Sequence, residues 1–166
     1  MPTINSSIIG VNMGNTSDGT TQNFALGTTC FGTQDSEWVY VTVATSQPVT
    51  GACLFVNISG TAFGCQSQGS GALYGWQLAF AQAPFATNDF GWVARRGIGI
   101  YVLVSSCSTL SCNLYYASGT GILSSQAAAS GTALSINLFT AAATATAVPQ
   151  QAWVSWPRTG TALSPM

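Results

Sequence analysis

Short β-prone runs recur along the chain and constrain its fold more than any other feature of the sequence. The clearest run is residues 37–43, in which β-branched and aromatic residues dominate. In a strand, alternate residues share a face, so three valines would lie on one side and two aromatic rings on the other: Val39, Val41 and Val43 against Trp38 and Tyr40. Both faces are apolar enough to be covered, by a second sheet or by a neighbouring molecule.

Other runs of this kind are separated by turn-forming residues at intervals of about 8–12 residues, the spacing typical of sandwiches and barrels. They lie at residues 52–58, 74–80, 91–94, 97–104, 113–117, 133–140 and 152–156. No window has sustained helical periodicity. The expected fold is therefore all-β: a single-domain β-sandwich or β-barrel of short antiparallel strands. The dipeptide Gly-Trp occurs at 75–76 and again at 91–92, a match too short to define a repeat.

The first 22 residues differ from the rest of the chain. They are polar and rich in Gly, Asn and Thr, with isolated aliphatic residues at Ile4, Ile8, Ile9 and Val11. We expect residues 1–22 to form an extended N-terminal arm, with these aliphatic side chains as candidate partner contacts, and residues 23–166 to form the β-rich domain. A frayed terminus is the alternative.

The scarcity of charge excludes several functions. Charged residues make up 4% of the 166 residues, and the chain has no histidine and no lysine. Three arginines are too few for nucleic-acid binding driven by counterion release, or for a basic helix on a membrane surface. Without histidine, the commonest general base and metal ligand is missing. No apolar run reaches the length of a membrane span. We therefore expect no enzyme activity, catalytic residue, cofactor, metal, nucleic acid or membrane, and a neutral surface suited to assembly.

The few charges form two groups that each allow two interpretations. Asp35 and Glu37 are the only close acids, and a solvated loop is favoured over acid–base chemistry or calcium binding. Arg95 and Arg96 are adjacent, so in a regular strand only one of them would face a core. They predict either a salt bridge to Asp89 or Glu37 of a neighbouring subunit, or charges that protect a sheet edge.

Gly97 and Gly99 flank Ile98 in a β-prone region. No helix follows them and no Lys-Ser/Thr pair is present, which argues against a phosphate-binding loop. The pair indicates a turn, a bulge or a tight strand crossing instead.

The five cysteines are an odd number, and several lie within strand-like segments. We expect them to be small buried hydrophobic residues of a reduced cytoplasmic protein. Cys107 and Cys112 are close enough in sequence to pair, and a metal site there is disfavoured because no other ligand group is near.

Several segments resemble a family of small tailed-bacteriophage head decoration, or capsid cement, proteins. The resemblance covers roughly residues 24–157 in a consistent order. It is carried by Ala-Leu-Gly-Thr at 25–28, Asp-Ser-Glu-Trp-Val-Tyr-Val at 35–41, Gly-Trp-Gln-Leu-Ala-Phe-Ala-Gln at 75–82, Asp-Phe-Gly-Trp-Val-Ala-Arg-Arg-Gly at 89–97, the stretch 113–123, and Val-Ser-Trp-Pro at 154–157. Ser118 stands where the family usually has Ala, and neither the arm nor the five cysteines belong to the family pattern.

The resemblance implies a non-enzymatic virion protein on the capsid exterior, made in the host bacterial cytoplasm. Such a protein would clamp neighbouring major capsid subunits, as a homotrimer or a dimer. Tryptophan and arginine are enriched at protein interfaces. The candidate contacts in the domain are therefore Trp38, Trp92, Arg95, Arg96, Trp156 and Arg158, although we expect most of the tryptophans to be core.

Two other functions remain open. A tail or fibre subunit would assemble without limit, whereas a cement protein would form a small closed oligomer. A secreted carbohydrate-binding β-sandwich would use exposed Trp and Tyr with Asn and Gln, and would contain paired disulfides.

Overall fold

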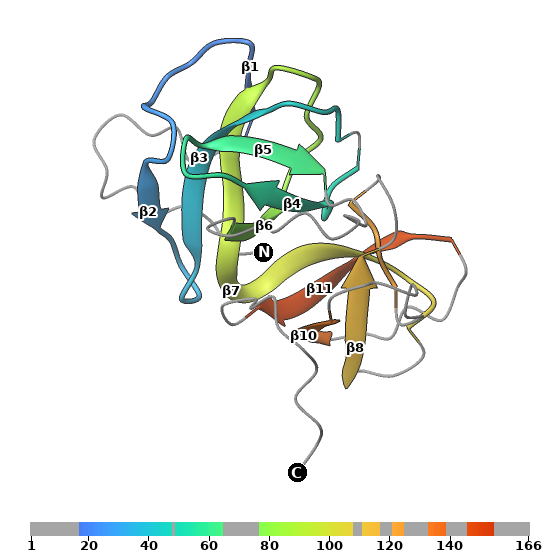
Figure 1. Cartoon of the computed structure of the whole chain (residues 1–166). Helices are drawn as coiled ribbons and strands as arrows, with labels where there is room; N and C mark the ends of the chain where they lie inside the picture. The colour runs from blue at the N-terminus through green and yellow to red at the C-terminus, as the bar shows by residue number, and fades with distance from the viewer. Residues whose placement is uncertain are drawn as a thin grey trace.

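The computed structural model of the protein describes residues 17–47, 49–64, 77–107, 111–116, 121–124, 133–138 and 146–154. At residues 63–64, 111–113, 115–116 and 133–138 only the backbone is described. Every regular element within these ranges is a β-strand, which confirms the all-β prediction. The strands (Figure 1) are β1 (Ser17–Gly19), β2 (Thr29–Phe31), β3 (Glu37–Val43), β4 (Cys53–Val56), β5 (Thr61–Gly64), β6 (Gln77–Ala81), β7 (Phe90–Ser105), β8 (Ser111–Tyr116), β9 (Leu123–Ser124), β10 (Ala133–Leu138) and β11 (Val148–Val154).

Strand β7 is 16 residues long and bends in its middle (Figure 1). The sequence predicted two strands here, but the backbone stays paired through the junction, because Arg96 lies opposite Glu37 and Gly97 lies opposite Val154. On each side of the bend, β7 has one extra residue relative to its partner strand. This residue is Arg95 in the pairing with β3 and Gly99 in the pairing with β11. Of the turn, bulge or tight strand crossing expected at Gly97 and Gly99, the structure has a bulge at Gly99, whereas Gly97 is paired with Val154.

A first closed ring is formed by β3, β5, β4, β6 and the first half of β7, in that order. Four of its pairings are antiparallel, and β3–β5 is parallel. Alternate residues of these strands meet in one buried cluster of mainly small aliphatic side chains. We place this cluster inside the ring. Its members on the strands are Val39, Val41, Val43, Leu54, Val56, Ala62, Ala79, Ala81 and Val93.

A second closed ring is formed by the second half of β7 with β9, β8, β10 and β11. Again four pairings are antiparallel, and one, β7–β9, is parallel. Figure 1 shows the two rings as two lobes, one above the other, with β7 running from the first into the second.

The two rings have the same topology. When the strands of each ring are numbered along the chain, neighbours follow the order 1-3-2-4-5, and strands 1 and 3 are the parallel pair. The strand registers of the two rings agree as well. On the first strand of each ring, two residues four positions apart pair with a buried residue of the fifth strand and of the third strand, respectively. These pairs are Val39–Val93 and Val43–Ala62 in the first ring, and Ile100–Ala152 and Val104–Leu123 in the second. The fold therefore contains the same five-stranded topology twice, a structural duplication in which β7 belongs to both copies. The strands expected from the sequence did not indicate this duplication.

The outer wall of the first ring is buried against the second. Trp38, Tyr40 and Phe80 point away from the interior valines and join one cluster with Ile100 and Val102 of the second ring. The prediction that both faces of residues 37–43 are covered is confirmed, and the chain itself provides the cover. Backbone hydrogen bonds also join the rings: Cys53 N donates to Gly121 O over 2.7 Å, and Leu103 N donates to Gly51 O over 2.7 Å.

Residues 17–22 of the expected arm lie against the first ring. Strand β1 is antiparallel to β7, with Ser17 opposite Gly91 and Gly19 opposite Phe90. Residues 1–16, with Ile4, Ile8, Ile9 and Val11, lie outside the described residues.

The cysteines differ from the reduced set that the sequence suggested. Cys30 and Cys53 are buried and lie outside any disulfide, and burial raises the pKa of the Cys30 thiol to about 11. Cys107, however, is disulfide-bonded, and its partner is not among the described side chains.

Candidate partner-binding surface

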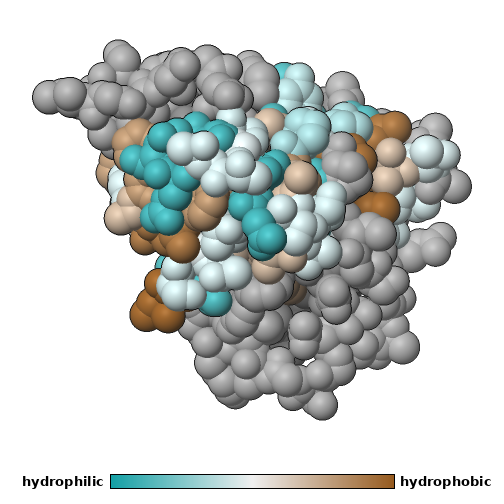
Figure 2. Space-filling model, turned by 90° about the horizontal axis from the view of Figure 1, so that it is seen from above, coloured by the Kyte–Doolittle hydropathy of each residue, from teal (hydrophilic) through white to brown (hydrophobic). Residues whose placement is uncertain are grey.

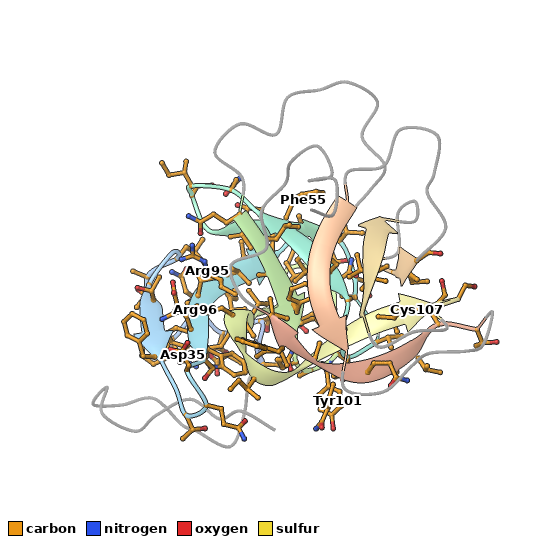
Figure 3. All side chains as sticks on the ribbon, turned by 90° about the horizontal axis from the view of Figure 1, so that it is seen from below. Asp35, Phe55, Arg95, Arg96, Tyr101 and Cys107 are labelled. Carbon is orange, nitrogen blue, oxygen red and sulfur yellow. The ribbon has the colours of Figure 1, made fainter. Side chains whose placement is uncertain are left out.

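Four charged side chains meet where the first ring joins the second. Arg95 Nη1 lies 2.7 Å from Glu37 Oε1, and Arg96 Nε lies 3.4 Å from Glu37 Oε2. Arg96 Nη2 is 3.4 Å from Asp35 Oδ1. The side chain of Glu37 is only 7% exposed, whereas that of Asp35 is 73% exposed. Figure 3 shows Arg95, Arg96 and Asp35 together at one side of the molecule.

A bulge explains why two consecutive arginines reach the same carboxylate. Residues 94 and 96 of β7 lie opposite residues 38 and 37 of β3, so Arg95 is the extra residue. The strand loses its alternation there, and both guanidinium groups can turn towards Glu37. In a regular strand, the side chains of Arg95 and Arg96 would point to opposite faces.

These charges are paired within one chain. Each carboxylate oxygen of Glu37 lies within ion-pair distance of an arginine. The buried member of the acid pair Asp35–Glu37 is therefore occupied by ion pairs. The arrangement fixes the β2–β3 turn against the bend of β7. Ser36 Oγ donates to Thr33 O over 2.7 Å, and Ile98 N donates to Gln34 O over 3.1 Å.

The predicted tryptophan and arginine contacts outside the charged cluster are either buried in the core or outside the described residues. Trp38 and Trp92 are fully buried in the core of this chain. Trp156 and Arg158 lie outside the described residues. Trp153, one of the five tryptophans considered from the sequence as interface anchors, is 49% exposed on β11.

Trp153 belongs to an uncharged surface that we call the Tyr101 face. Across β7 and β11, Ile98 lies opposite Trp153, Tyr101 opposite Gln151, and Leu103 opposite Pro149. Leu103 is buried; the other five residues define the face, and Ile98 in it is 42% exposed. The bulge at Gly99 lets Ile98 and Tyr101, three residues apart, share one side of the strand. Tyr101 projects from the ribbon in Figure 3.

Other large apolar residues are exposed on the first ring. Phe31, at the end of β2, is 62% exposed, and Ile58, in the turn after β4, is 99% exposed. Figure 2, which views the molecule from above, shows mostly pale and teal residues, with brown atoms towards the edges. The coloured part of this face is therefore mostly hydrophilic or intermediate in hydropathy, with apolar atoms near its edges.

The equivalent face of the first ring is covered. Tyr40 and Trp92 are cross-strand partners, and the ring of Phe24 packs 5.2 Å from Tyr40 and 5.3 Å from Trp92. The Tyr40 hydroxyl donates to Asp18 Oδ2 over 2.7 Å and accepts from Asn23 N over 3.0 Å. Burial, with a smaller contribution from Asp18, raises the pKa of Tyr40 to about 12.

Among the described residues no group of three or more Cys, Asp or Glu is placed to hold a metal ion. The same part of the chain has no helix that could span a membrane.

Comparison of the chain with protein-family models, with curated proteins and with solved structures found no match.

Proposed function

We propose that this protein is a non-enzymatic capsid decoration protein, which binds the outer surface of an icosahedral phage shell and clamps neighbouring major capsid subunits. The observation that carries the proposal is the scarcity of charge on a surface that exposes large apolar side chains. The charged groups at the junction of the rings pair with one another within the chain, and the exposed side chains include large apolar ones. Desolvating such a surface costs less than desolvating charges.

The doubly closed fold also supports this role. The nine strands of the two closed rings have partners on both edges, which limits strand-to-strand aggregation of the free subunit despite its low charge. Many copies on one shell act together, so each contact can be small. A ligand that binds only the assembled shell stabilises it by mass action.

The direct experiment mixes the purified full-length protein with undecorated shells of its phage. Stoichiometric binding and a higher shell melting temperature are expected. Phe31→Ser and Ile58→Ser should lower occupancy if these exposed residues contact the shell, whereas Asp35→Asn should not. Absence of binding by the folded wild-type protein would refute the proposal.

Sedimentation of the isolated protein separates a cement protein from a tail or fibre subunit. We expect a small closed oligomer, a trimer or a dimer. Open-ended polymers would favour the tail or fibre subunit.

A saccharide-binding module is the second candidate. It is favoured by the exposed Trp153 beside the Tyr101 hydroxyl and the Gln151 amide, whose Nε2 lies 3.5 Å from that hydroxyl. The disulfide at Cys107 fits an oxidising compartment. Quenching of Trp153 fluorescence by neutral oligosaccharides, lost in Trp153→Phe, would support this function over the first.

A further inference from the structure

The segment that joins β1 to β2 runs along the outside of the first ring (Figure 1). Residues 20–23 and residue 25 are exposed, whereas Phe24 is half-buried. The ring of Phe24 packs 5.2 Å from that of Tyr40 and 5.3 Å from that of Trp92, and Asn23 N donates to the Tyr40 hydroxyl over 3.0 Å. The contacts of this segment with the ring therefore converge on Tyr40 and Trp92.

A glycine in the left-handed region stands at each end of the segment. Gly19 has φ 61° and Gly27 has φ 80°, and an added Cβ at either position would have open space around it. Before the segment, the register of β1 against β7 shifts between Ser17 and Gly19. After it, Gly27 N donates to Tyr40 O over 2.8 Å, which keeps that end on β3. Because glycine changes φ without a side-chain clash, residues 20–25 can swing outwards while both ends stay attached.

The surface beneath the segment is aromatic and uncharged. Tyr40 and Trp92 are at most 1% exposed, and their rings meet edge to face 5.1 Å apart. Phe24 adds a third ring to this pair, an arrangement that aromatic groups favour. The pair Tyr40–Trp92 is therefore a site for a neutral aromatic ring, and in this structure the chain itself supplies that ring.

Opening the segment leaves no hydroxyl without a partner. Tyr40 OH donates to Asp18 Oδ2 over 2.7 Å, and Asp18 precedes the pivot at Gly19, so this bond remains when Asn23 moves away. Outward movement of residues 20–25 breaks the bond from Asn23 N and the ring contacts of Phe24, and it leaves the strand pairing of both rings intact. Segments with few buried apolar contacts open at a much lower free energy than the whole domain.

We propose that residues 20–25 are a lid that opens on Gly19 and Gly27. In the closed lid, Phe24 is an autoinhibitory plug in a site on Tyr40 and Trp92 that binds a neutral aromatic ring presented by another molecule. The ligand presents the same chemical group as Phe24, so binding requires the lid to be open. The proposal goes beyond the proposed function, and its tests require no shells.

Hydrogen exchange of single amides, followed by NMR, tests the lid in the full-length protein. The amide of Asn23 should exchange about 100-fold faster than that of Leu103, whose bond to Gly51 O joins the two rings. Tyr40→Phe removes the acceptor of Asn23 N and should speed its exchange about fivefold. Tyr101→Phe, the same substitution on the second ring, is the control and should leave it unchanged. Equal exchange at Asn23 and Leu103, after correction for intrinsic rates, would overturn the lid.

Benzyl alcohol serves as the probe for the aromatic site. Phe24→Ala vacates the site, so the probe should raise the melting temperature of this variant in a saturable way. Phe31→Ala removes an exposed ring at the end of β2 and is the matched control, with no shift expected. Cyclohexylmethanol, which has a similar size and no aromatic ring, should give a smaller shift. No shift in Phe24→Ala, or equal shifts in the two variants, would show that Tyr40 and Trp92 do not form such a site.

The wild-type protein gives an independent measurement of the same competition. Benzyl alcohol that takes the place of Phe24 should speed exchange of the Asn23 amide and leave that of Leu103 unchanged. Acceleration at both amides would indicate general destabilisation by the alcohol, contrary to the proposal.

Discussion

The side chain of Gln82 pairs with the backbone of Tyr101 as a strand residue would. Gln82 Nε2 donates to Tyr101 O over 3.0 Å, and Tyr101 N donates to Gln82 Oε1 over 2.9 Å. Gln82 follows β6 of the first ring and is buried, whereas Tyr101 lies in the part of β7 that belongs to the second ring. One amide thus satisfies two partly buried backbone groups at the junction of the rings.

Gln82→Met should destabilise the protein by about 2 kcal/mol, because a partly buried N–H and a partly buried C=O of Tyr101 lose their partners while the volume of the side chain is kept. Urea unfolding measures the change. Gln22→Met, at an exposed glutamine that bonds only Phe24 O, is the control and should change stability by less than about 0.5 kcal/mol. Equal effects of the two substitutions would mean that the junction does not rely on this amide.

Removing the negative charge should lower the free energy of unfolding much more at Glu37 than at Asp35. Glu37→Gln leaves two guanidinium groups facing a neutral amide in a mostly buried site, and a loss of about 3 kcal/mol is expected. Asp35→Asn removes a solvent-exposed charge and should cost less than about 1 kcal/mol. Thermal and urea unfolding of both variants provide the comparison. A larger effect at Asp35 would contradict the assignment of Glu37 as the centre of the cluster.

Alkaline pH should weaken the fold in two overlapping steps. The folded-state pKa of Cys30 is raised from 9.0 to about 11, and that of Tyr40 from 10.0 to about 12. Both groups favour the protonated form when folded, so their stabilisation is complete below the unfolded pKa and is lost as pH rises to the folded value. The free energy of unfolding should therefore fall from about pH 9 to about pH 12. Cys30→Ala should remove the lower part of this fall and Tyr40→Phe the upper part; an unchanged pH profile in both would exclude these groups as the cause.

Gly97→Ala should be among the most damaging single changes in β7. Gly97 has φ 142°, and an added Cβ would lie 2.8 Å from Ser36 Cβ and 2.9 Å from Ser36 Cα. Backbone strain and the clash together predict a loss of about 3 kcal/mol. Gly27→Ala, with φ 80° but open space around it, should cost only the strain, about 1 kcal/mol. The difference between the two melting temperatures reports the clash; no difference would contradict it.

Thiol counting should distinguish the disulfide-bonded state from a fully reduced chain. Five cysteines with one disulfide at Cys107 leave three thiols. Iodoacetamide under denaturing conditions should add three groups without reductant and five after reduction, as measured by intact mass. Five additions without reductant would show a reduced protein. In the native state Cys30 and Cys53 should be protected, because both are buried.

Local patterns predicted the strands well where the residues alternate or are β-branched. Residues 37–43 match β3 at both ends, and their two faces separate as expected. The short strands β1, β2 and β9 escaped prediction, because two or three residues carry no periodicity. The continuity of β7 was missed because Gly97 and Gly99 usually interrupt strands, whereas here they bend one.

The structural duplication has a weak counterpart in two short sequence matches. Tyr-Val-x-Val occurs at 40–43 and 101–104, and Cys-x5-Ser-Gly-Thr occurs at 53–61 and 112–120, offsets of 61 and 59 residues. The Tyr101 face could not have been foreseen from these matches. Tyr40 and Tyr101 are identical residues in equivalent positions, and only the chain packed above them makes one buried and leaves the other partly exposed.

The strand that the two rings share has a consequence for how such a protein can change over time. A tandem array can grow or shrink by whole units because each unit keeps its own walls. Here removal of either copy would take a wall from the other, so the number of copies is locked at two. The two five-stranded rings are built from nine strands because both include β7, so neither ring can be gained or lost without the other.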